Sequence, residues 1–235
     1  MALWIHAAYL ALLAGIVATT VVGKRTQNFP AFVNGVGSLL LALFPPLVEI
    51  GASLVVTFEF TIGIELPLWI AAAGFLHMLG MLGWYDTVWW WDHVTHTVSA
   101  ALIAATIYAS LLTLDRTAPE LGLSPLYVVS FTILFTLAIG VFWEFIELAA
   151  RELGHRIDRP PVLEHYGLKD TALDLVFNGV GALLVVMLDV RVFVPITEQI
   201  PRMTWLFLIL GVIGVVGGSL VLGVLLGSTS SRNGA

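Results

Sequence analysis

The sequence has no cysteine and little charge: of its 235 residues, 11% are charged and 59% are hydrophobic. The absence of cysteine excludes disulfides, thiolate metal ligands, iron–sulfur clusters and cysteine nucleophiles. A soluble domain carries about 25% charged residues, so the composition excludes a cytosolic globular enzyme and a disordered chain. Ten basic against sixteen acidic residues offer no basic stripe for nucleic acid. With a mean hydropathy of +0.97, the sequence indicates a protein whose surroundings and first partner are the lipid bilayer.

Seven apolar segments approach the length of about 20 residues that a helix needs to cross a bilayer. They predict an all-α, polytopic transmembrane helix bundle of about seven spans, or six if one of the shorter segments does not cross. We expect a single transmembrane helical domain over 1–227, with its polar site within 70–190, and a disordered tail at 228–235. Pro45 and Pro46 predict a kink in the second span. The predicted spans are 2–22, 35–57, 66–84, 92–114, 125–149, 171–189 and 205–227.

The distribution of basic residues predicts how the chain is oriented. With seven spans, seven of the ten lysines and arginines fall on one side of the membrane and three on the other. Short loops rich in Lys and Arg stay in the cytoplasm, so we expect a cell-membrane protein with its N-terminus outside and its C-terminus in the cytoplasm. The sequence leaves the oligomeric state open.

Costly polar residues gather at the ends of four consecutive spans. An ionisable group inside a membrane costs about 2.5–3.5 kcal/mol on insertion scales, so such groups indicate function. Because successive spans cross in opposite directions, these four ends meet at one face, which the charge count makes cytoplasmic. Spacings of three and four residues turn the polar groups of each span to one side, which predicts a shared inward-facing site. Its members are His77, Asp92, His96, Glu144, Glu147, Asp170, Asp174 and Asn178.

Several carboxylates facing one another need protons, a bound metal or a basic partner such as Lys169 or Arg151 at the rim. Histidine with carboxylate and amide oxygens suits zinc, manganese or iron, and we expect one such divalent metal as cofactor. Glu144 is the expected general acid or base, Asn178 is expected to orient the substrate, and Glu147 is a further catalytic candidate. The candidate metal ligands are His77, Asp92, His96, Asp170 and Asp174, and the first choice among them is His77, His96 and Asp174.

Simpler structural roles stay open for individual members. Asp92 and Asp170 stand at helix N-termini, where a carboxylate caps backbone N–H groups. Glu147 is four residues from Arg151 and could pair with it. His77 could be a hydrogen-bonded interior histidine. The occurrence of several such residues at one depth favours a functional site over capping alone.

The same residues carry a family resemblance. The run Leu76-His77-x-x-Gly80…Tyr85, followed by Asp92-x-x-x-His96, Glu144-x-x-Glu147 and Asp170-x-x-x-Asp174, resembles the uncharacterised YjdF-like bacterial inner-membrane proteins. The order Asp-x-x-x-His…Glu…Asp-x-x-x-Asn-x-x-Gly is also similar to the VanZ-like family, implicated in glycopeptide resistance. The likeness spans about 70–190. Trp143-Glu144 stands where the first family has Tyr-Glu, and Asn178 fits the second family better. The resemblance implies a shared site without implying a reaction.

Three functions remain open on the sequence. The first is a metal-dependent hydrolase or transferase that acts on a lipid or lipid-linked substrate near the cytoplasmic leaflet. The second is a proton- or cation-coupled transporter, in which Glu49 and His6 extend the polar path outward. The third is a non-catalytic membrane interaction protein whose polar cluster only fixes helix packing.

Overall fold

The computed structural model describes residues 2–55, 58–163 and 167–233, which are helical throughout apart from turns and loops. Seven helical segments are long and apolar enough to cross a membrane, which confirms the predicted all-α polytopic bundle. The helices are α1 (Ala2–Arg25), α2 (Phe29–Val55), α3 (Glu65–Leu79), the π-helical turn η1 (Gly80–Trp84), α4 (Tyr85–Thr87), α5 (Trp91–Thr117), the 3₁₀ turn η2 (Pro119–Leu121), α6 (Pro125–Arg156), α7 (Leu168–Met187), α8 (Val194–Gln199) and α9 (Pro201–Asn233).

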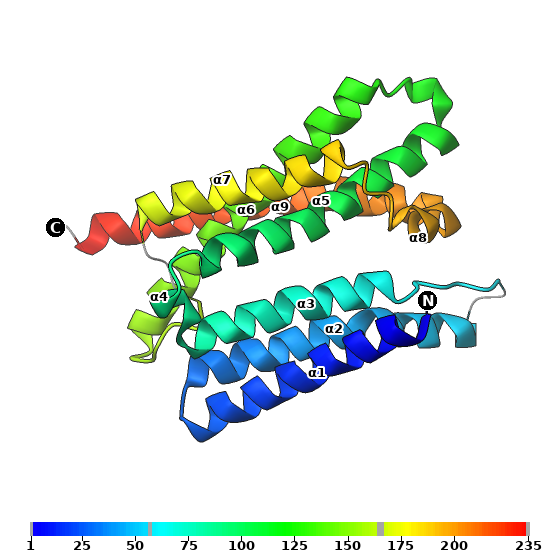
Figure 1. The fold of residues 1–235 in the computed structure, drawn as a ribbon. Helices are drawn as coiled ribbons and strands as arrows, with labels where there is room; N and C mark the ends of the chain where they lie inside the picture. Colours follow the sequence, from blue (N-terminus) through cyan, green and yellow to red (C-terminus); the bar gives the residue numbers. More distant parts are fainter. Residues whose placement is uncertain (1, 56–57, 164–166, 234–235) are drawn as a thin grey trace.

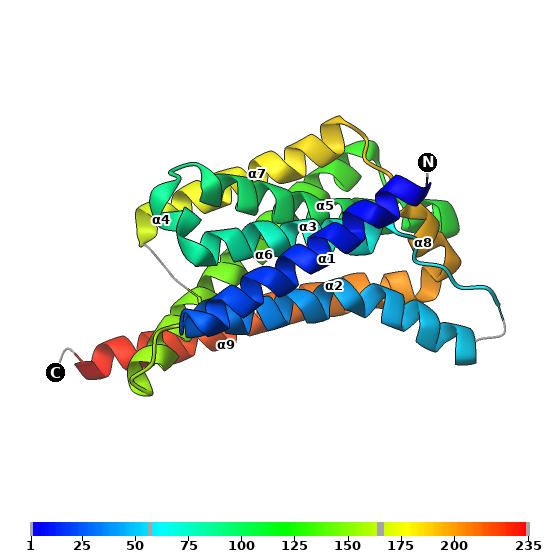
Figure 2. The same ribbon diagram turned by 60° about the horizontal axis from the view of Figure 1, so that its bottom comes forward.

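The spanning helices form two groups (Figures 1 and 2). Helices α1, α2 and α3 pack against one another, while α5 packs against α6, α7 and α9. The groups meet where α3 contacts α5. Alanines along α5, such as Ala104 and Ala105, are fully buried and let its neighbours approach closely. Gly181 of α7 lies so near that a Cβ there would come within 2.4 Å of the Thr97 carbonyl oxygen.

The two ends of the bundle differ in the chain segments they hold. The last turns of α3 and α6 and the first turns of α5 and α7 lie together on the side of the C-terminus (Figure 1); we call this the site end. The loops 58–64 and 188–200 lie at the other end with the N-terminus, and we call it the opposite end. The expectation that four polar helix ends share one face is therefore confirmed.

Helices α2 and α9 extend beyond the ends predicted from the sequence. Helix α2 begins at Phe29, before the predicted residue 35, because the Asn28 side chain accepts a hydrogen bond from the Ala31 N–H (3.0 Å) and caps it. It runs on through Pro45 and Pro46, and its axis changes direction in its second half (Figure 2). Helix α9 continues to Asn233, so the backbone of 228–233 is helical where a disordered tail was expected; 234–235 lie outside the described residues.

Candidate metal centre

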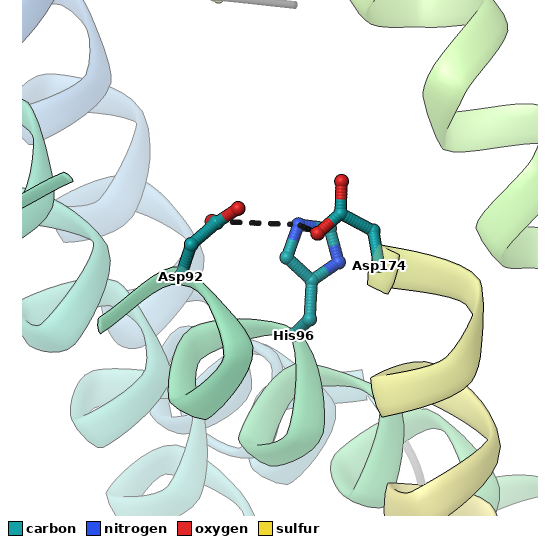
Figure 3. Close-up of side chains that lie close together, drawn as sticks. All are labelled: Asp92, His96 and Asp174. Carbon is teal, nitrogen blue, oxygen red and sulfur yellow. Dashed lines mark ion pairs between the residues drawn. The ribbon is translucent and has the colours of Figure 1, made fainter. Parts of the chain in front are cut away.

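The first two turns of α5 and α7 bring two aspartates and a histidine together. Asp92 and His96 lie one turn apart on α5, and Asp174 faces them from α7 (Figure 3). His96 Nε2 is 3.6 Å from an Oδ1 atom of each aspartate. One ligand atom from each of the three residues lies within 4.8 Å of the other two.

These distances fit a shared cation. Zinc binds imidazole nitrogen and carboxylate oxygen at about 2.0–2.2 Å, so two tetrahedral ligands are about 3.4 Å apart. The observed 3.6 Å from nitrogen to oxygen is longer than an N–H···O hydrogen bond and close to that ligand spacing. The geometry thus leaves room for an ion among the three side chains with little movement.

Burial adds a second observation at this cluster. Asp174 is only 2% exposed, and its Oδ1 makes no hydrogen bond within the described part of the chain. A buried carboxylate oxygen without a donor is costly unless it is paired or coordinates a metal. The oxygen faces His96 (Figure 3), so the unmet acceptor lies where a cation would sit.

Asn178 holds the histidine ring from the other side. Its Oδ1 is 3.3 Å from His96 Nδ1, which leaves Nε2 turned to the aspartates. Such a contact on the second ring nitrogen fixes the orientation of a metal-binding histidine. Gly140 of α6 leaves space for the Asn178 side chain, because a Cβ at this position would lie 2.6 Å from Asn178 Nδ2.

A cavity of about 500 Å³ opens beside this cluster between the two helix groups. Helices α2, α3, α5, α6 and α7 all contribute to its wall. Its volume is in the range of small-molecule sites. Seven of the eight predicted site residues line it: His77, Asp92, His96, Glu147, Asp170, Asp174 and Asn178.

Glu144 is the predicted residue that does not line the cavity. It is 5% exposed, and its Oε2 accepts a hydrogen bond from the Thr171 hydroxyl of α7 (2.6 Å). Glu147, one turn further along α6, does reach the cavity and accepts a hydrogen bond from the Trp143 indole (2.8 Å). The two glutamates therefore occupy different environments, one between helices and one on the cavity wall.

His77 lies on the same cavity but outside the three-residue cluster. Its Nδ1 is 2.8 Å from the Tyr85 hydroxyl and its Nε2 is 3.2 Å from Asn34 Oδ1. Asn34 also donates to the Val162 carbonyl oxygen (2.5 Å), which ties α2 to the segment after α6. Asp170 likewise lines the cavity without joining the cluster.

The backbone of η1 explains the spacing of the His77 motif. Gly83 has φ +110°, a conformation that favours glycine, and it turns the chain so that Tyr85 folds back toward α3. The Tyr85 ring then covers Gly80, where a Cβ would come within 2.3 Å of it. Glycines at 80 and 83 are thus what allows Tyr85 to reach His77.

Sequence reasoning missed three contributors. Asn34 stood one residue before the predicted second span, and Tyr85 was noted only as part of the family motif. Thr171 gave no signal, because a threonine in the first turn of a helix is ordinary. His93, by contrast, lies outside the cavity lining and stacks on Phe177 with ring centroids 4.2 Å apart.

Residues 5–195 match a protein family described as predicted membrane protein, DUF2238. The chain belongs to this family. DUF2238 is the YjdF-like family, so the first resemblance is confirmed, and every predicted site residue lies inside the matched range. Helix α9 lies beyond it. Neither the curated proteins nor the solved structures provide a match to the chain.

Proposed function

We propose that this DUF2238 protein is a membrane-embedded, metal-dependent hydrolase or transferase that acts on a lipid or lipid-linked substrate. Asp92, His96 and Asp174 hold a divalent cation of the zinc, manganese or iron class. The observation that carries the proposal is a buried aspartate oxygen without a hydrogen-bond donor, 3.6 Å from a histidine nitrogen, on the wall of a cavity of about 500 Å³.

The remaining residues receive roles from where they lie. Three protein ligands leave positions open for water and substrate. Glu147, on the cavity wall, accepts the proton of the attacking water and returns it to the leaving group. Asn178 positions His96, and Glu144 fixes α7 through Thr171. His77 and Asp170 stay candidate ligands on the same wall.

The cavity supports chemistry better than transport. The lining carboxylates and histidines belong to the site end, whereas Glu49, near the opposite end, accepts a hydrogen bond from the Ile62 N–H (2.8 Å). By the distribution of basic residues the site end faces the cytoplasm. The likeness of the Asp-x-x-x-His and Asp-x-x-x-Asn spacings to the VanZ-like family suggests a comparable site there.

Metal analysis of the purified protein tests the proposal. We expect about one equivalent of a divalent metal in the wild type and at least a tenfold loss in His96→Ala and Asp174→Asn. His93→Ala is the matched control, since His93 lies on the same helix but outside the cavity lining. Equal metal in all four proteins, or none in any, would show that the ligand set is wrong.

Reconstitution separates the enzyme from the alternatives. Vesicles containing wild type or Glu147→Gln are compared for proton or cation uptake and for turnover of added phospholipid. Uptake that depends on Glu147, without turnover, would replace the enzyme with a transporter. A His96→Ala variant that only unfolds, with no metal in the wild type, would leave a packing role for the cluster.

A further inference from the structure

A second cavity lies beside the first, further along the same helices. It has a volume of about 290 Å³. Four residues line both cavities: Ile70, Leu102, Ile103 and Ile139. The two spaces are therefore neighbours across a shared apolar wall, and together they extend from the candidate metal centre toward α9.

The lining becomes apolar with distance from the metal centre. Asp92 and Thr106 are fourteen positions apart on α5, which is about 21 Å along a helix. The second cavity ends against Phe207, Gly211 and Val215 of α9. The polar side chain in its lining is that of Thr106, whose hydroxyl donates to the Leu102 carbonyl oxygen of its own helix (2.9 Å).

The first cavity also reaches the side of the bundle. Val33 and Leu41 of α2 and Trp143 of α6 line it, yet they are 37%, 64% and 40% exposed. A side chain that is both a wall of a cavity and part of the outer surface marks the edge of an opening. In a bundle that spans a bilayer, an opening between two spanning helices faces lipid.

We propose that the apolar extension binds the hydrocarbon chain of a membrane lipid, which enters sideways between α2 and α6 and places its polar head group at Asp92, His96 and Asp174. This inference rests on the proposed function and names its substrate class: a lipid with a long chain and a head group whose oxygen atoms bind the cation.

The chemistry of the two spaces selects this occupant. A peptide or sugar in the second cavity would lose its hydrogen bonds to water and find only the Thr106 hydroxyl in the described lining, whereas a hydrocarbon chain has none to lose. In the first cavity the lining carries acids and histidines with no lysine or arginine among the described residues. An anionic head group therefore binds there only through the metal.

A photoreactive lipid tests where the chain lies. The probe is phosphatidic acid with a diazirine at the end of one acyl chain, added to the metal-loaded protein in phosphatidylcholine vesicles. We expect crosslinks concentrated in 102–107 and 207–215 and removed by excess unlabelled phosphatidic acid. Labelling that is uncompeted, or that falls equally on outer residues such as Leu10, which is 62% exposed, would overturn the inference.

Neighbouring residues of α9 give matched variants. Val215 lines the second cavity, whereas Val216 is 53% exposed on the outside of the same helix. Val215→Trp fills the cavity and should reduce the competed labelling at least fivefold, and Val216→Trp should leave it unchanged. Equal labelling of the two variants would contradict the assignment. If Val215→Trp fails to fold, the competition result for the wild type still decides.

The measurements can refute the metal-dependent enzyme and the lipid-chain site independently of each other. Metal content is measured on the same samples as the crosslinks. Bound metal with uniform labelling would refute the lipid-chain site and leave the metal centre standing. Competed labelling at α9 without any bound metal would refute the metal-dependent enzyme and leave a lipid-binding protein.

Discussion

Two groups of polar side chains, one at each end of the bundle, differ in the spacing of their atoms. At the opposite end they meet at ordinary hydrogen-bond distances: Thr113 and Thr197 are 2.6 Å apart, and Tyr108 donates to Asp189 at 2.7 Å. At the site end, His96 is 3.6 Å from Asp92 and Asp174 beside a large cavity. The first arrangement needs no ligand, and in our proposal the second holds a cation. If the proposal is correct, the spacing among polar groups distinguishes residues that hold helices together from residues that bind a ligand.

The largest effect on thermal stability is expected from adding metal. The proposed ligands Asp92, His96 and Asp174 lie at the site end, so a bound ion should stabilise that end alone. A divalent cation at one hundred times its Kd stabilises the folded state by about 2.7 kcal/mol. We expect the wild-type Tm to rise with metal and fall with a chelator, measured by thermal unfolding in detergent. Asp189→Asn, at the opposite end, should keep the whole shift. Loss of the shift in that variant would mean that the ions bind elsewhere.

Thr197→Val breaks a complete pair. It removes one partner of the buried Thr113 hydroxyl, and an unsatisfied buried group costs about 1–3 kcal/mol. The Tm should therefore fall with or without metal. Thr117→Val is the control, since Thr117 is exposed and its hydroxyl donates within its own helix, to the Thr113 carbonyl oxygen. A metal-dependent effect of Thr197→Val would couple the two ends.

Asp174→Asn should raise the Tm of the metal-free protein, whereas Thr197→Val lowers it. It replaces a buried carboxyl group whose Oδ1 has no hydrogen-bond donor, and relieving an unsatisfied buried polar group is worth about 1 kcal/mol. We expect a higher Tm without metal and a lower Tm than wild type with it. A lower Tm under both conditions would show that Asp174 and His96 form a stabilising pair, like the pairs of the opposite end.

The smallest effect is expected from Asp189→Asn. A hydrogen bond from exposed Arg191 (2.8 Å), and then one from Tyr108, lower the pKa of Asp189. The pair therefore stabilises the protein above the ordinary pKa, and this contribution is lost as the pH falls through the lowered value. We expect a small Tm difference from wild type near pH 7 that disappears in acid. A difference that grows in acid would contradict this sign.

The sequence predicted the spans and the shared end of the bundle well, because length, hydropathy and alternate crossing determine both. It resolved less of the site. Glu144 and Glu147 are about 60° apart around a helix, which is enough to turn one toward Thr171 and the other into the cavity. Their spacing of three residues had predicted that both glutamates face one shared site.

Local backbone and long-range contacts were beyond the sequence prediction. Trp91 is 6% exposed and donates to the Leu76 carbonyl oxygen (3.0 Å), a contact that no pattern in the sequence indicates. Asn34 reaches His77 across forty-three positions of the chain. The spacing of residues in a sequence does not indicate such a contact, because the contact depends on how two helices are placed side by side.

The π-helical turn at Gly80–Trp84 has a consequence for how this region tolerates change in length. The hydroxyl of Tyr85 meets His77 only because the wider turn and the positive φ of Gly83 set the direction in which the ring leaves the backbone. Each residue added to or removed from 80–84 would swing that ring by about 100°. The number of residues between the histidine and the tyrosine is therefore as strict a requirement as their identity.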